Sequence, residues 1–185
     1  MTNNIILFTF SSILLFSILL ILLFLYISSI INFIYYKVPQ IATYNSDIKR
    51  MKLWLKKYNL EWKKIIDLWS GTWKSIRFFE KYFKAKPTWY EIDYTNYFIS
   101  VILNKIYWLN ANIKRSNFLN ANLEEYDFIY IYLFPKTMDS ISDFIYSTSK
   151  KWTIIFVNAF KIKNAIPIEI LYNKNWKEEI YIYKV

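Results

Sequence analysis

The chain opens with a long apolar run. From Ile5 to Tyr26 nearly every side chain is apolar, and residues 1–36 carry no charge. About 20 such residues cross the hydrocarbon core of a bilayer as one helix. A cleaved signal peptide would instead begin with basic residues and end in a small-residue cleavage site, features that this segment lacks. The pattern therefore predicts one N-terminal transmembrane helix.

Beyond residue 45, short apolar runs alternate with stretches of helical periodicity. The periodicity predicts helices over about 47–58 (with Ser46 as its cap), 73–84, 95–108 and 136–149. The apolar runs predict strands over 63–68, 88–93, 112–118, 127–134 and 151–160. The last 20 residues alternate around a polar turn, which is typical of a hairpin.

This alternation is typical of an α/β domain. Strands that alternate with helices form a mostly parallel sheet with helices on both faces. The final hairpin would complete a seven-stranded, Rossmann-like sheet with an antiparallel edge. We therefore expect an anchor over 1–36, a linker and lead-in helix over 37–60, and a cofactor-binding domain over 61–185. In open sheets of this kind the ligand binds beyond the carboxyl ends of the strands.

The composition excludes several kinds of chemistry. Neither Cys nor His occurs among the 185 residues. A disulfide framework, a thiolate metal site, a Ser-His triad and the usual zinc ligands are therefore excluded. We expect no metal cofactor.

The charge suggests where the domain lies. The net charge of +10 belongs wholly to residues 37–185. Cations cluster just after the apolar run, at Lys37, Lys49, Arg50, Lys52, Lys56 and Lys57. The positive-inside tendency places the domain in the cytoplasm. A basic surface suits anionic lipid or nucleic acid; the wide spread of Lys favours lipid, and we expect no nucleic-acid partner.

Glycine and tryptophan occur in unusual numbers. Gly71 is the only glycine, against about 13 at average usage, whereas tryptophan occurs eight times. The abundant Ile, Asn, Lys, Phe and Tyr have A/T-rich codons, and the usual tryptophan codon does not. Seven tryptophans stand near strand starts, turns or a helix end, where glycine is favoured: Trp62, Trp69, Trp73, Trp89, Trp108, Trp152 and Trp176.

Our hypothesis is that the source organism reads UGA as glycine, and that these codons are rendered as tryptophan in this sequence. The alternative is that the tryptophans are genuine. Under the first hypothesis DLWSGTW (67–73) becomes D-L-G-S-G-T-G after the first strand. Such glycines let the backbone approach a cofactor closely, and the N–H groups of the next helix can meet a carboxylate. Glu91 ends the second strand, where a carboxylate can accept hydrogen bonds from ribose hydroxyls.

From about Val38 onward, seven short motifs follow one another in a characteristic order and spacing: VP (38–39), DLWSGTW (67–73), WYEID (89–93), NF (117–118), DFIYIYLFPKTMD (127–139), KWTIIFVNAF (151–160) and EEIYIYK (178–184). In these motifs the chain resembles a bacterial group of membrane-anchored, S-adenosylmethionine-dependent class I methyltransferases. This group is related to the mitochondrial lysine methyltransferases that act on the ATP synthase c-subunit and the adenine nucleotide translocase. It implies methyl transfer from S-adenosylmethionine to a protein lysine at or near the membrane.

The resemblance also implies a set of site residues. The cofactor-binding residues would be Asp67, Trp69, Ser70, Gly71, Trp73, Glu91, Asn117 and Phe118. Asp67 would order the loop beneath the methionine end of the cofactor. Asn117 replaces the usual acid, and its side-chain carbonyl can accept from the adenine amino group. Tyr132 and Phe134 would line the substrate channel, or are ordinary core aromatics.

The chain departs from the group in two further respects. The segment KVPQIAT (37–43) is poorer in Pro and Thr than usual. If Trp69 and Trp73 are genuine, their indoles fill the cofactor's space, and we would then expect a non-catalytic, membrane-anchored binding module. A nicotinamide-dependent oxidoreductase would use the same glycines and acid; the hairpin and YLFP (132–135) argue against it. The Asn-Pro-Pro-Tyr motif of amino-directed nucleic-acid methyltransferases is absent.

Overall fold

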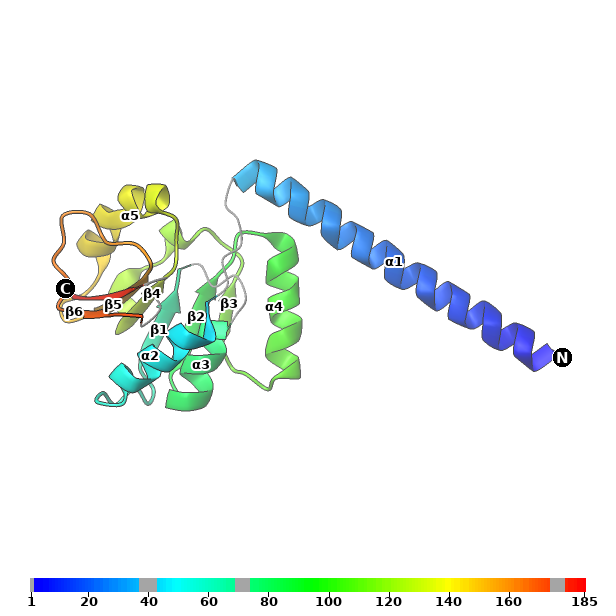
Figure 1. Cartoon of the computed structure of the whole chain (residues 1–185), viewed down its shortest axis with the longest axis horizontal. Helices are drawn as coiled ribbons and strands as arrows, with labels where there is room; N and C mark the ends of the chain where they lie inside the picture. The colour runs from blue at the N-terminus through cyan, green and yellow to red at the C-terminus, as the bar shows by residue number, and fades with distance from the viewer. Residues whose placement is uncertain (1, 37–42, 69–73, 174–178) are drawn as a thin grey trace. The chain divides into compact units, whose positions relative to one another are not determined.

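The computed structural model describes residues 2–36, 43–68, 74–173 and 179–185. It divides the chain into two compact units, Met1–Pro39 and Gln40–Val185 (Figure 1). The residues singled out by the sequence that lie outside the described residues are Lys37, Val38, Pro39, Trp69, Ser70, Gly71, Trp73 and Trp176.

The first unit is a helix, α1 (Thr2–Tyr36). Its stretch Ile6–Ser28 has a mean hydropathy of 2.8 and contributes nothing to a protein core. The hydroxyls of Thr9 and Ser17 donate to backbone carbonyls of the preceding turn at 2.9 and 2.8 Å. Polar side chains must be satisfied within the helix in this way if they are to lie in hydrocarbon. The helix is thus long and apolar enough to cross a membrane, as the sequence predicts.

The second unit is built on a seven-stranded sheet. Its strands are β1 (Lys64–Asp67), β2 (Lys86–Tyr90), β3 (Asn112–Lys114), β4 (Phe128–Ile131), β5 (Ile154–Asn158), β6 (Glu169–Leu171) and β7 (Ile180–Lys184). They lie in the order β3-β2-β1-β4-β5-β7-β6. The pairs among β1 to β5 are parallel, and β7 is antiparallel to both neighbours. This confirms the predicted Rossmann-like sheet with a closing hairpin.

Helices and turns connect the strands. They are α2 (Asn45–Leu55), α3 (Lys74–Phe83), α4 (Tyr94–Ile106), α5 (Pro135–Thr148) and the 3₁₀ turns η1 (Phe118–Asn120) and η2 (Leu123–Glu125). Two expectations were wrong in detail. The first of these helices already begins at Asn45, after Tyr44, so Ser46 does not cap it. The third strand ends at Lys114 and does not reach residue 118, because Phe118 starts η1.

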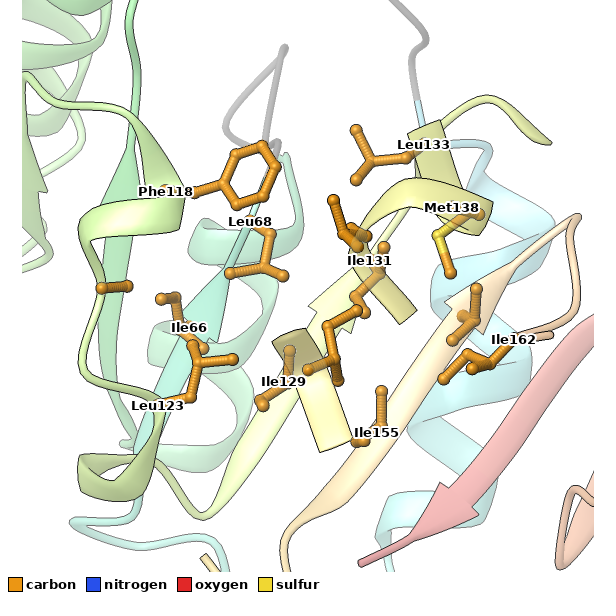
Figure 2. Packing of buried hydrophobic residues seen from close by; sticks show 14 of the residues in the cluster. Ile66, Leu68, Phe118, Leu123, Ile129, Ile131, Leu133, Met138, Ile155 and Ile162 are labelled. Carbon is orange, nitrogen blue, oxygen red and sulfur yellow. The ribbon is translucent and has the colours of Figure 1, made fainter. Parts of the chain in front are cut away.

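The sheet is covered on both faces. Successive strand residues point to opposite faces, so Phe128 and Tyr130 of β4 pack in a cluster with α2 and α3. Ile129 and Ile131 pack in the other cluster, which includes α5 and η2; Figure 2 shows part of it. The continuous apolar runs of β4 and β5 are explained by this two-sided burial.

Three tryptophans adopt backbone conformations that favour glycine. Trp62, Trp108 and Trp152 have φ values of 63°, 54° and 75°, and their side chains are 67%, 90% and 63% exposed. Trp108 follows the C-cap of α4, where its N–H donates to Lys105 O (3.1 Å) and Leu109 N–H donates to Asn104 O (2.9 Å). These are the two bonds of a Schellman motif, whose left-handed residue is usually glycine.

Two other tryptophans lie in the interior. Trp54 is buried on α2, stacks on Tyr58 at 4.7 Å between ring centroids, and donates its Nε1–H to Glu169 at 2.5 Å. Trp89 is the fourth residue of β2 and does not open the strand as expected, because β2 already begins at Lys86. Its indole is buried and Nε1 has no hydrogen-bond partner, which costs about 1–3 kcal/mol for a genuine tryptophan.

We expect Trp108→Gly to stabilise the printed chain by about 1 kcal/mol. The substitution relieves the left-handed backbone of a bulky residue, and little packing is lost because the indole is exposed. Trp54→Gly is the matched control, and it should cost about 3–5 kcal/mol because a packed core indole is removed. Urea unfolding of the full chain in detergent, followed by near-ultraviolet circular dichroism, measures both. Destabilisation by Trp108→Gly would contradict the expectation.

Candidate functional site

The carboxyl ends of β1, β2 and β4 meet at one edge of the sheet. Asp67 at the end of β1 pairs with Trp89 on β2 and with Tyr130 on β4. The next residue, Leu68, donates its N–H to Tyr130 O at 3.1 Å. The residues that follow these strands therefore gather at this edge, where the sequence placed the site.

Asp67 ties the end of β1 to the start of α3. It is fully buried, and its carboxylate accepts a hydrogen bond from the hydroxyl of Ser75 in the first turn of α3. The two residues stand on either side of segment 69–73 in the sequence; that Asp67 orders this loop stays a prediction, because the segment lies outside the described residues. Ser75 was not predicted; its place two residues after the DLWSGTW motif (67–73) is the signal in the sequence.

Glu91 is a buried carboxylate just beyond β2. Its backbone N–H donates to Lys114 O at 3.0 Å, which holds it beside the end of β3. Its Oε1 accepts from the Asp93 N–H at 2.8 Å. Burial raises the pKa of the Glu91 carboxyl from 4.5 to about 7, and the charges of Asp93 and Asp67 add to the rise. An ionised Glu91 therefore needs further donors.

Asp93 shapes the same corner of the edge. It is buried and caps α4, since its carboxylate accepts from the Asn96 N–H at 2.6 Å. This residue was expected at a strand end, and its capping role was not predicted. The signal was present, because Asp before an apolar helical run is a favoured N-cap.

Asn117 and Phe118 lie after β3. The Asn117 side-chain oxygen, expected to meet adenine, accepts from the Leu119 N–H at 3.0 Å and caps η1. An amide oxygen has a second lone pair, so this bond leaves one acceptor position. Phe118 is buried in the same cluster as Leu68, and Figure 2 shows the two side chains close together.

Tyr132 and Phe134, the two aromatic residues that follow β4, lie in different environments. Tyr132 is buried in the cluster that also holds Tyr130 and helices α2 and α3. Phe134 is half-buried and precedes α5 as its N-cap residue. The structure thus does not bring these two side chains into one cluster.

A buried polar network at the ends of β4 and β5 was not predicted. Asn158, the last residue of β5, donates to Asp47 Oδ2 at 2.9 Å. Asp47 pairs with Arg50 at 2.7 Å. Tyr130 OH lies 3.1 Å from Thr43 Oγ1 and 3.5 Å from Asn158 Nδ2. Burial raises the pKa of Tyr130 above its usual range, so the phenol stays neutral. The Asn158 Oδ1 is buried without a partner.

A cavity of about 630 Å³ lies at the opposite edge. It is lined by Lys64, Lys86 and Asn112, the first residues of β1, β2 and β3, and by the exposed Trp62. Ligands of open α/β sheets bind at the carboxyl ends, so this cavity is not the candidate cofactor site.

We expect the folded unit to lose stability as pH rises from about 4.5 to 7. The raised pKa means that folded Glu91 keeps its proton where the unfolded chain has lost it, so its contribution is complete below pH 4.5 and lost by about pH 7. The loss is about 3 kcal/mol. Urea unfolding of Glu91→Gln should lack this component, whereas the exposed control Glu124→Gln should retain it. Identical pH profiles for Glu91→Gln and the unmodified chain would contradict the assignment.

Comparison with known proteins identifies the fold. No protein-family model and no curated protein sequence matches the chain. An RNA methyltransferase from Salinibacter ruber, solved with S-adenosyl-L-homocysteine, matches with a TM-score of 0.68 at 16% identity, over 78% of this chain and 93% of that one. A methyltransferase from Pyrococcus furiosus matches with a TM-score of 0.55 at 11% identity, over 85% and 95%. The tRNA methyltransferase TrmK of B. subtilis matches with a TM-score of 0.55 at 12% identity, over 72% and 64%. The second unit has the Rossmann-like fold of class I methyltransferases.

Proposed function

We propose that the chain is an S-adenosylmethionine-dependent methyltransferase. The observation that carries the proposal is the buried Glu91, placed beyond β2 beside the carboxyl end of β1 in a seven-stranded methyltransferase-type sheet. A carboxylate in this position can accept from both hydroxyls of a ribose. The hydroxyls would supply the donors that an ionised, desolvated carboxylate requires.

The neighbouring residues suit the rest of this cofactor. The free lone pair of Asn117 can accept from the adenine amino group. Phe118 lies beside it as an apolar wall. Asp67 and Ser75 hold the two ends of segment 69–73, whose N–H groups would meet the methionine carboxylate. The bound cofactor supplies an electrophilic methyl group, and the chain aligns the acceptor and excludes water.

The proposal includes glycine in place of tryptophan at seven positions: 62, 69, 73, 89, 108, 152 and 176. Support comes from the described tryptophans: of the eight in the chain, five are described, and three of these have positive φ. Such values occur in only a few per cent of non-glycine residues and are least suited to bulky ones. Trp54 is excluded from the set because its packing and its bond to Glu169 use the indole.

A protein lysine at the membrane is the proposed acceptor. The apolar α1 would hold the enzyme at the bilayer, and the cations that follow it favour a cytoplasmic domain. An RNA acceptor is the second candidate, since structural neighbours include RNA methyltransferases and the net charge is +10. A chain with genuine Trp69 and Trp73 would instead be a non-catalytic binding module.

We expect methyl transfer from the chain with glycine at these seven positions, purified at full length in nanodiscs. Tritiated S-adenosylmethionine and membrane extract should yield label in a protein lysine, because the anchored enzyme meets membrane proteins first. The printed chain is the control and should transfer nothing, since its indoles would fill the cofactor site. Glu91→Gln should weaken S-adenosylhomocysteine binding at least about tenfold, through lost charge-assisted hydrogen bonds.

Other outcomes discriminate among the alternatives. Label in added RNA would replace the lysine proposal with the RNA one. Cofactor binding without any transfer would favour the non-catalytic module, and selective binding of a nicotinamide nucleotide would favour the oxidoreductase.

We expect the mass of the native protein to be lower than that of the printed sequence by seven times the difference between a tryptophan and a glycine residue. Peptide mass spectrometry of protein isolated from its source should find glycine at residues 62, 69, 73, 89, 108, 152 and 176. Trp54 serves as the internal control and should be read as tryptophan. Tryptophan at residues 69 and 73 would overturn the enzyme proposal.

A further inference from the structure

Helix α4 packs its polar side inward. Ser100 is the one residue of α4 that is fully buried, and its hydroxyl bonds the Asn96 carbonyl. One turn later, the Asn104 side chain donates to Ala111 O at 3.2 Å, just before β3. These residues recur every four positions and therefore share one face of the helix. In Figure 1, α4 lies beside β3 at the end of the sheet.

The outward side of α4 is apolar. Tyr94, Phe98, Ile102 and Ile106, again four residues apart, are 53%, 49%, 55% and 60% exposed, and Ile99 beside them is 37% exposed. We call these five residues the α4 stripe. A surface helix normally turns such a face to the core. A contiguous apolar patch of this kind is typical of a binding surface.

Cations stand at both ends of the stripe. The Arg115 guanidinium lies 3.9 Å from the Tyr94 ring centroid. Beyond the other end, Arg77 and Lys81 lie 5.0 and 5.5 Å from the ring of Tyr107. Lys105 is the only charged residue of α4, and the helix contains no acid. Two nearby carboxylates accept hydrogen bonds from backbone N–H groups: Asp93 caps the helix, and Glu80 Oε1 accepts from the Asn110 N–H.

We propose that the α4 stripe lies on an anionic lipid surface, with its apolar side chains in the headgroup region and its cations among lipid phosphates. Apolar and aromatic residues on one side of a helix with Lys and Arg around them define an interfacial helix. The inference rests on the membrane attachment in the proposed function. With α1 in the bilayer, the effective lipid concentration near the stripe is high, so a weak surface affinity suffices.

The charge pattern favours lipid over a second copy of the chain. A self-association surface would bring Lys105, Arg115 and Lys81 of two copies close together. Like charges across an interface oppose association, whereas anionic headgroups attract each of them. The chain also contains no Cys, so single labels can report on the stripe.

The test places one fluorescent label on the full chain in nanodiscs that contain phosphatidylglycerol. Ile102→Cys carries the label in the middle of the stripe. Ser147→Cys, exposed on α5 across the sheet, is the matched control. We expect lipid-borne spin labels to quench the label at residue 102 several-fold more than the label at residue 147. Phosphatidylcholine alone, or added Phe98→Glu and Ile106→Glu, should abolish the difference.

The outcomes separate this inference from the proposed function. Equal quenching at the two positions in chains that insert stably into nanodiscs would overturn the lipid contact but leave the anchor and the methyl transfer standing. Cross-linking of two copies through residue 102, without lipid quenching, would also overturn it and make the stripe a dimer surface. Failure of the chain to enter nanodiscs would refute the anchor, and with it this inference.

Discussion

The candidate site at the carboxyl edge of the sheet depends on the desolvated carboxylate of Glu91. Burial and the charges of Asp93 and Asp67 oppose its ionisation, and the backbone N–H groups of Asp93 and Ile92 only partly offset them. A group in this position costs stability near neutral pH unless a ligand brings donors. Carboxyl groups with perturbed pKa values cluster at functional sites. The fold supports the group on β2 and β3, and the ligand would complete its solvation.

The periodicity of the chain predicted the order of the main elements and the sheet type. The strands were predictable because two-sided burial makes β4 and β5 continuous apolar runs. Boundaries were less predictable: the 112–118 run was read as one strand, yet Asn117 turns the chain into η1 by capping it. Side-chain capping is a local alternative to strand pairing that periodicity does not register. The Asn158–Asp47 bond joins residues 111 positions apart, and no sequence pattern could have indicated it.

Four of the five described tryptophans fall into two physical classes. Trp54 is a core residue with ring contacts and a satisfied Nε1–H. Trp62, Trp108 and Trp152 are exposed and have left-handed backbones, and the rings of Trp62 and Trp152 contact lysine ammonium groups at the surface. A genuine change of residue preference would favour indoles where they pack, not where they strain the chain. The argument from backbone conformation does not extend to Trp89, because this residue lies in a regular strand. Only its unpartnered Nε1–H distinguishes it from an ordinary core residue.

Membrane attachment and the α4 stripe bear on the choice of acceptor. A tether alone would confine the folded unit to the bilayer surface but leave it free to rotate, so soluble and membrane acceptors would both remain accessible. A second contact through Phe98, Ile102 and Ile106 would fix one side of the unit against the lipid. Restricting the orientation raises the effective concentration of acceptor groups held at one depth relative to groups that diffuse in solution. A lysine near the headgroups would gain from this arrangement. An RNA would gain little, because an anionic surface that attracts Arg115 and Lys105 would repel its phosphates.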